Sequence, residues 1–149
     1  MQYRDNTIDT VKELRRTLDY LETRSEIDRQ SIAFFGYSWG GVNGPTAMAQ
    51  EPRIKVGVID IGFLPKMSST PEVDPVNALP RVRQPTLLLS GEFDAMIPVE
   101  NARRYFSLIG TPPADKRHKI VIGGHFIPRE VVIRESLDWL DRYLGSPRR

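Results

Sequence analysis

Three polar side chains in this sequence are of the types that nucleophilic catalysis by serine requires. Ser38 lies in the segment GYSWGG, Asp94 in SGEFDAMIP and His125 in GGHF. A serine hydroxyl is a weak nucleophile at neutral pH unless an adjacent base takes its proton. An imidazole suits that task, and a carboxylate on its other nitrogen fixes the tautomer and stabilises the imidazolium. The three residues therefore predict an acyl-transfer site, provided that a fold brings them together.

The residues around Ser38 favour a sharp turn between a strand and a helix. In such a turn the strained backbone lifts the serine hydroxyl above the sheet. Gly36 and Gly40 are expected to avoid the clashes that side chains would make there. The backbone N–H of the next residue, Trp39, is the expected oxyanion donor, assisted by the dipole of the helix that begins at this point. A lone Gly-x-Ser-x-Gly is a weak signal, so an ordinary turn serine stays the alternative for Ser38.

The acid and the base also have competitors. Glu92 is an alternative acid, and Asp60 is a further one, although a capping or turn carboxylate is the preferred interpretation of Asp60. His118 lies in the basic run KRHK and is expected at the solvated surface. Four apolar residues beside the polar ones are candidates for the substrate pocket, with packing against the sheet as the alternative: Trp39, Phe93, Met96 and Phe126.

Short apolar segments alternate with amphipathic ones along the chain. Apolar runs predict strands over residues 31–36, 54–60, 85–91 and 119–124. Apolar residues at steps of three and four predict a helix over roughly 7–24, and further helices are expected after Trp39, from Pro98 and from Pro128. Residues 62–84 hold several prolines and no clear period, which indicates a loop or a reduced cap.

This alternation is typical of a parallel sheet covered by helices on both faces. We therefore expect an α/β fold of about four mainly parallel strands, in a single domain over residues 1–149. In such sheets ligands bind at the carboxyl ends of the strands. Ser38, Asp94 and His125 follow the first, third and fourth predicted strands, so the fold class places all three at the same end of the sheet.

Composition argues against other kinds of site. The 149 residues carry a net charge of +2, with no cysteine and two histidines. A small, dispersed charge gives no reason to expect nucleic acid, and the lack of cysteine excludes a thiolate nucleophile or thiolate metal site. Histidine pairs at metal-binding spacing and glycine-rich nucleotide loops are also missing. We expect no metal, no cofactor and no membrane partner, and a cytoplasmic location.

The order of the three motifs resembles the α/β-hydrolase superfamily. Nucleophile, acid and histidine follow one another in that order, and the helix before FFGYSWGG is similar to the dienelactone-hydrolase, acetyl-esterase and oligopeptidase-like branch. The resemblance covers nearly the whole chain. It implies Ser38 as nucleophile, Asp94 as acid and His125 as base in a serine esterase that cleaves small acyl esters.

The resemblance also implies that part of the usual fold is missing. The nucleophile strand is usually the fifth of about eight, but here it is the first, so the loop that gives the second oxyanion N–H is absent from this sequence. Loss of one such donor lowers the rate by about 10²–10³. Residues 31–36 would form an exposed edge, so we expect a homodimer or higher oligomer through them. A catalytically inactive or partner-dependent fragment that acts as an interaction module is the alternative.

Overall fold

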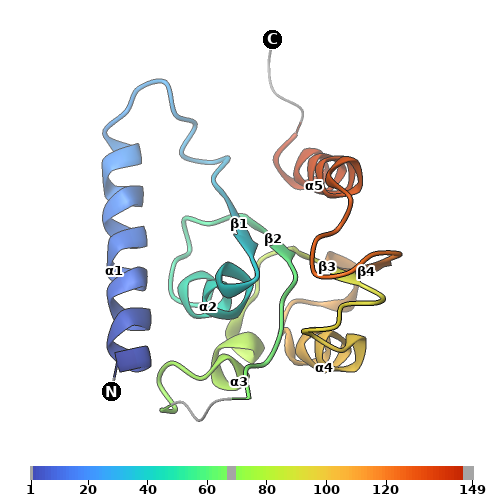
Figure 1. Cartoon of the computed structure of the whole chain (residues 1–149). Helices are drawn as coiled ribbons and strands as arrows, with labels where there is room; N and C mark the ends of the chain where they lie inside the picture. Colours follow the sequence, from blue (N-terminus) through green and yellow to red (C-terminus); the bar gives the residue numbers. More distant parts are fainter. Residues whose placement is uncertain (1, 67–69, 146–149) are drawn as a thin grey trace.

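The computed structural model of the chain describes residues 2–66 and 70–145 (Figure 1). Four strands form one parallel sheet in the order β1-β2-β3-β4. Their bounds are Ala33–Tyr37 for β1, Val56–Asp60 for β2, Thr86–Gly91 for β3 and Lys116–Val121 for β4. The expected α/β class with four parallel strands is therefore confirmed.

Helices cover both faces of the sheet. The longer helices are α1 (Gln2–Glu22), α2 (Trp39–Met48), α4 (Val99–Leu108) and α5 (Arg129–Leu144). The short ones are α3 (Pro75–Ala78), η1 (Leu79–Arg81) and η2 (Pro113–Asp115). Figure 1 shows α5 on the side of the sheet opposite to α2, α3 and α4. Within the described ranges, no helix has both the length and the apolar character needed to cross a membrane.

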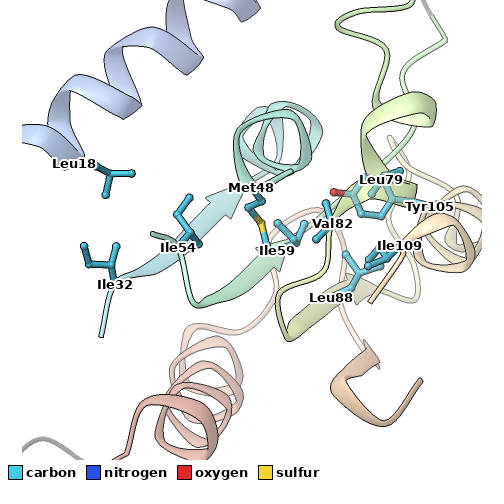
Figure 2. Packing of buried hydrophobic residues seen from close by; sticks show 10 residues of the cluster. All are labelled: Leu18, Ile32, Met48, Ile54, Ile59, Leu79, Val82, Leu88, Tyr105 and Ile109. Atoms are coloured by element: carbon cyan, nitrogen blue, oxygen red, sulfur yellow. The ribbon is translucent and has the colours of Figure 1, made fainter. Parts of the chain in front are cut away.

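Side chains alternate between two core clusters because successive strand residues point to opposite faces of the sheet. Figure 2 shows the cluster on the α2 and α4 side, where Met48, Ile59, Leu88 and Tyr105 are almost completely buried. The cluster on the α5 side contains Val58, Leu87, Leu89 and Trp139. Both faces of β2 and β3 are thus buried, which explains why these strands read as continuous apolar runs.

Strand β1 lies at an edge of the sheet, as the sequence predicted for this segment. The carbonyl oxygen of Ile32 accepts from Lys55 N at 2.8 Å, and Ser38 N donates to Asp60 O at 2.9 Å, so these backbone groups face the inner neighbour. Backbone groups alternate along a strand, so those of Phe35 point to the free side. An apolar pocket of about 280 Å³ lies beside this edge, lined by residues of α1, β1 and α2. The pairing of two copies through β1 stays a prediction.

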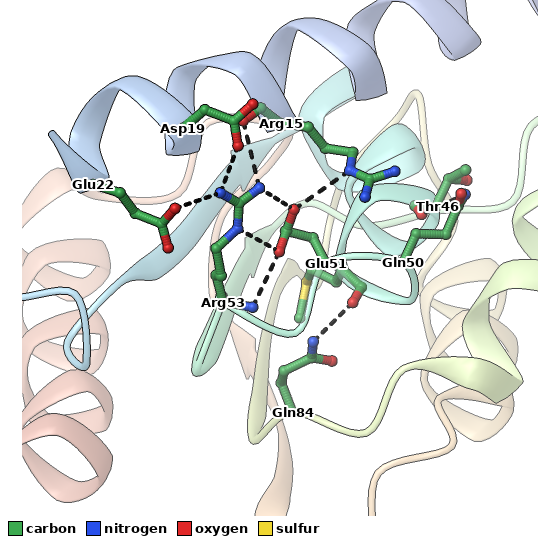
Figure 3. Close-up of polar contacts among 9 residues, drawn as sticks. Arg15, Asp19, Glu22, Thr46, Gln50, Glu51, Arg53 and Gln84 are labelled. Carbon is green, nitrogen blue, oxygen red and sulfur yellow. Dashed lines mark hydrogen bonds and ion pairs between the residues drawn. The ribbon is translucent and has the colours of Figure 1, made fainter.

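An ion-pair cluster attaches α1 to the turn between α2 and β2 (Figure 3). The guanidinium of Arg53 donates to Glu51 at 2.6 and 2.8 Å, to Asp19 at 2.7 Å and to Glu22 at 3.1 Å. Glu51 is only 3% exposed, and its hydrogen bonds with Arg53 lower the pKa of its carboxyl. The cluster therefore fixes the position of the helix that precedes β1.

The expectation that His118 lies at the solvated surface is only partly right, because its side chain is half-buried on the edge strand β4. Strand β4 begins at Lys116, so the whole KRHK segment belongs to the sheet, and His118 lies in register with the fully buried Leu88. Its Nε2 is 3.0 Å from the hydroxyl of Ser90, and its ring lies 5.3 Å from that of Phe106. Burial lowers the pKa of His118 to about 4, which keeps its imidazole neutral.

Residues 62–84 contribute more to the core than a loop or reduced cap would. This segment contains α3 and η1, and it buries Val73, Ala78, Leu79 and Val82. Residues 67–69 lie outside the described part. Helix α1 also begins at Gln2, several residues before the predicted start. Turns and short helices such as α3 and η1 are too short to show an apolar period in the sequence.

Candidate active site

Ser38 occupies the turn between β1 and α2 in a strained backbone conformation. Its φ is 49° and its ψ is −104°, in a region that residues other than glycine rarely adopt. The turn is fixed on both sides, because Ser38 N donates to Asp60 O at 2.9 Å and Val42 N donates to Ser38 O at 3.0 Å. The strand-to-helix turn expected from the sequence is present.

The two glycines of the motif have different roles. A Cβ atom on Gly36 would lie 2.6 Å from the carbonyl oxygen of Gly40, so no larger residue fits at position 36. A Cβ atom on Gly40 would have no neighbour within 4 Å. The expectation that Gly40 also avoids a clash is therefore wrong.

Ser38, His125 and Asp94 form a continuous line of polar contacts at the carboxyl end of the sheet. The hydroxyl of Ser38 lies 3.1 Å from His125 Nε2, and His125 Nδ1 lies 2.8 Å from Asp94 Oδ2. The other oxygen of Asp94 accepts the N–H groups of Met96 at 2.8 Å and Ile97 at 3.0 Å. With Asp94 ionised, the proton of the imidazole resides on Nδ1 and leaves Nε2 free to accept from Ser38. The arrangement is competent for proton transfer from the serine hydroxyl.

The competing acids lie in different surroundings. Glu92 is exposed, and it is Asp94 that contacts the imidazole of His125. Asp60 ends β2 and is 6% exposed, and its Oδ1 has no hydrogen-bond partner among the described residues, which gives no support to a capping role. Burial raises the pKa of Asp60 to about 6, an effect that the nearby His125 partly opposes. The site therefore contains a second buried carboxyl group.

Trp39 is the first residue of α2 and directly follows Ser38. The first N–H groups of a helix have no acceptor within it, and they carry the positive end of the helix dipole. The backbone N–H of Trp39 is thus available to an anion that forms at Ser38. This placement agrees with the oxyanion role expected for Trp39.

The four apolar candidates for the substrate pocket are all on the surface. Trp39, Phe93, Met96 and Phe126 are between 52% and 81% exposed, so they do not pack in the core. They come from the three segments that carry the polar site residues. Among the described residues, no group of three or more His, Cys, Asp or Glu side chains has an arrangement that can hold a metal ion.

Two tyrosines that the sequence did not predict as site residues contact the segments around Ser38 and His125. The hydroxyl of Tyr37 donates to the backbone carbonyl of His125 at 3.2 Å. The hydroxyl of the fully buried Tyr105 donates to Gly41 O at 2.6 Å in α2, and burial raises its pKa well above the usual value. The position of Tyr37 directly before Ser38 was the available signal, whereas nothing in the sequence relates Tyr105 to Gly41.

Comparisons with known proteins identify the fold. No family model matches the chain. Cutinase 2 from Thermobifida cellulosilytica is 26% identical over 150 residues, which cover 93% of this chain and 53% of the cutinase. This chain therefore spans about half the length of that relative.

Solved structures give the same result. A cold-adapted esterase from an Arctic intertidal metagenomic library superposes with a TM-score of 0.79 at 23% identity, over 93% of this chain and 59% of the esterase. The alpha/beta hydrolase GrgF from Penicillium sp. sh18 superposes with a TM-score of 0.78 at 14% identity, over 94% of this chain and 73% of that protein. The chain has the α/β-hydrolase fold, and the resemblance drawn from its sequence is confirmed at the level of the fold.

Proposed function

We propose that this chain carries the catalytic residues of a serine ester hydrolase. The observation that supports the proposal is the line of contacts from Ser38 through His125 to Asp94, formed at a strained strand-to-helix turn. The likeness to a cutinase and to an esterase supports ester hydrolysis over other acyl transfers. Because the chain spans about half of the cutinase, the activity of the whole protein is part of the proposal.

In the proposed reaction, Ser38 Oγ attacks the carbonyl carbon of the ester while its proton moves to His125 Nε2. Asp94 stabilises the resulting imidazolium through its contact with Nδ1. The tetrahedral oxyanion accepts from the N–H of Trp39 at the start of α2. The intermediate then expels the alcohol, which takes the proton from His125 and leaves an acyl group on Ser38.

Water then hydrolyses the acyl-enzyme, with water as the nucleophile and Ser38 as the leaving group. His125 takes a proton from a water molecule as the water oxygen attacks the acyl carbon, and then returns the proton to Ser38 as the carboxylic acid leaves. Trp39 is one backbone donor for the oxyanion.

The surroundings of Ser38 support small acyl esters as substrates. The side chains of Trp39, Phe93, Met96 and Phe126 present apolar surface to solvent, and each residue lies within two positions of Ser38, Asp94 or His125 in the sequence. Such exposed apolar surface favours acyl chains over charged substrates. We expect the acyl and alcohol groups of the ester to be bound through this exposed apolar surface. The proposed enzyme should therefore have broad specificity among short esters.

The test is the hydrolysis of p-nitrophenyl butyrate by the chain, by its Ser38→Ala variant and by Ser90→Ala. Ser90 is a matched control because its hydroxyl also contacts a histidine, His118, at 3.0 Å. We expect Ser38→Ala to lose at least about 10³-fold in turnover and Ser90→Ala to retain it. Equal background rates for the unaltered chain and Ser38→Ala would refute the proposal and favour an inactive fragment.

A further inference from the structure

The loop between β4 and α5, residues 122–128, is attached both to the segment that follows β3 and to the end of β1. Toward β3 it is held by Phe93 N, which donates to Gly123 O at 2.9 Å, and by the contact of 2.8 Å between Asp94 and His125. Toward β1 the hydroxyl of Tyr37 donates to the backbone carbonyl of His125 at 3.2 Å. The loop is thus held by one contact to Phe93 and one to Asp94 after β3, and by Tyr37 and the Ser38–His125 contact at the end of β1.

We infer that Tyr37 is a positioning residue that fixes the distance between the imidazole of His125 and the hydroxyl of Ser38. The effect of Tyr37 on turnover rests on the proposed function, whereas its effect on the position of the loop does not. Tyr37 precedes Ser38 directly in the chain and ends β1, and the backbone of Ser38 is itself hydrogen-bonded to β2. A bond from Tyr37 to the His125 backbone therefore links the two reacting residues through a rigid path.

The ring of Tyr37 adds two contacts to the same loop. It meets the imidazole of His125 edge-on at 5.7 Å and stacks on Phe126 at 6.0 Å with an interplanar angle of 29°. Edge-to-face and offset-stacked pairs of this kind are attractive. One side chain thus contacts two consecutive loop residues, by its hydroxyl on the backbone and by its ring on the side chains.

These two kinds of contact can be separated by substitution. Tyr37→Phe keeps the ring contacts and removes only the hydrogen bond to His125 O. If the ring alone mattered, by covering apolar surface, Tyr37→Phe would behave as the unaltered chain. If the hydroxyl holds the loop, the loop should open more often in Tyr37→Phe than in the unaltered chain. His125 would then be within reach of Ser38 less often. A misplacement of 1 Å can cost about 10² in rate, so a partial loss of position predicts a fall in kcat of roughly 10-fold.

The experiment compares Tyr37→Phe with Tyr143→Phe, measuring kcat and KM on p-nitrophenyl butyrate and amide hydrogen exchange of residues 122–128. Tyr143 is a matched control, because its hydroxyl donates to Asp115 at 3.1 Å, away from the loop. We expect Tyr37→Phe to lower kcat roughly 10-fold with KM nearly unchanged, and to speed exchange in the loop. Tyr143→Phe should do neither.

The two readouts separate this inference from the proposed function. Unchanged exchange in Tyr37→Phe would overturn the inference whether or not the chain is active. Unchanged kcat in a chain with Ser38-dependent turnover would overturn it as well. Faster exchange in a chain without Ser38-dependent turnover would refute the esterase proposal, while supporting the role of Tyr37 in holding the loop.

Discussion

A single methyl group at Gly91 should displace His125, the proposed base. Gly91 ends β3 where the loop before His125 passes closest to the strand. A Cβ atom at this position would lie 2.1 Å from the carbonyl oxygen of Gly124 and 2.7 Å from that of Gly123. Carbon and oxygen atoms do not approach within 3.0 Å without a shift, so Gly91→Ala must move the loop by about 1 Å. A displacement of this size next to His125 should lower kcat/KM by about 10².

Gly124→Ala provides the matched control, since it adds a methyl group to the other partner of the same contact. A Cβ atom there would meet only Phe93 O, at 3.8 Å, which is an ordinary contact. Rates on p-nitrophenyl butyrate would be measured for both variants after circular dichroism has shown that each is folded. Gly124→Ala should stay close to the unaltered chain. A Gly91→Ala variant that keeps kcat/KM within about threefold would refute the reasoning, because the loop would then tolerate the shift.

Three further predictions concern stability and assembly. Burial raises the pKa of Asp60 to about 6, so the folded state binds the proton of this carboxyl group more tightly than the unfolded state does. The free energy of unfolding should therefore fall by up to about 3 kcal/mol as the pH rises from about 4 to above 6. Asp60→Asn should flatten this decline in urea unfolding, and an unchanged slope would contradict the assignment. Arg53→Ala leaves the carboxylate of Glu51 buried without its main partner and should cost about 2 kcal/mol of unfolding free energy. Arg24→Ala, the control, removes an exposed pair with Glu26 and should leave the urea midpoint unchanged. Equal effects of the two substitutions would argue against the role of the cluster. Association through the free edge of β1 predicts a sedimentation coefficient that rises with concentration and falls back in Phe35→Lys, and a monomer at every concentration would refute it.

The sheet and the grouping of the polar residues could be predicted because both follow from local patterns. Val58 and Ile59 are neighbours in an apolar run and pack into opposite core clusters, and such a run is typical of a strand buried on both faces. Once four parallel strands are inferred, the residues that follow them must meet at one end of the sheet, and this predicts that Ser38, Asp94 and His125 lie close together.

The features that escaped prediction depend on contacts between distant residues. His118 is surrounded in sequence by Lys116, Arg117 and Lys119, and these charges concealed the alternation that turns its side chain inward. Helix α3 has four residues, too few for an apolar period. The bond from Tyr37 spans 88 residues, and no spacing rule connects its two ends.

The central claim is that His125 and Asp94 activate the hydroxyl of Ser38, and covalent labelling tests it most directly. The chain would be incubated with a fluorophosphonate, which reacts with activated serines, and the modified residue would be located by peptide mass mapping. We expect one label per chain, on Ser38, and its loss in His125→Ala, because an unassisted serine hydroxyl is a poor nucleophile. A chain that stays unlabelled, or a Ser38 that is labelled equally fast in His125→Ala, would contradict the account.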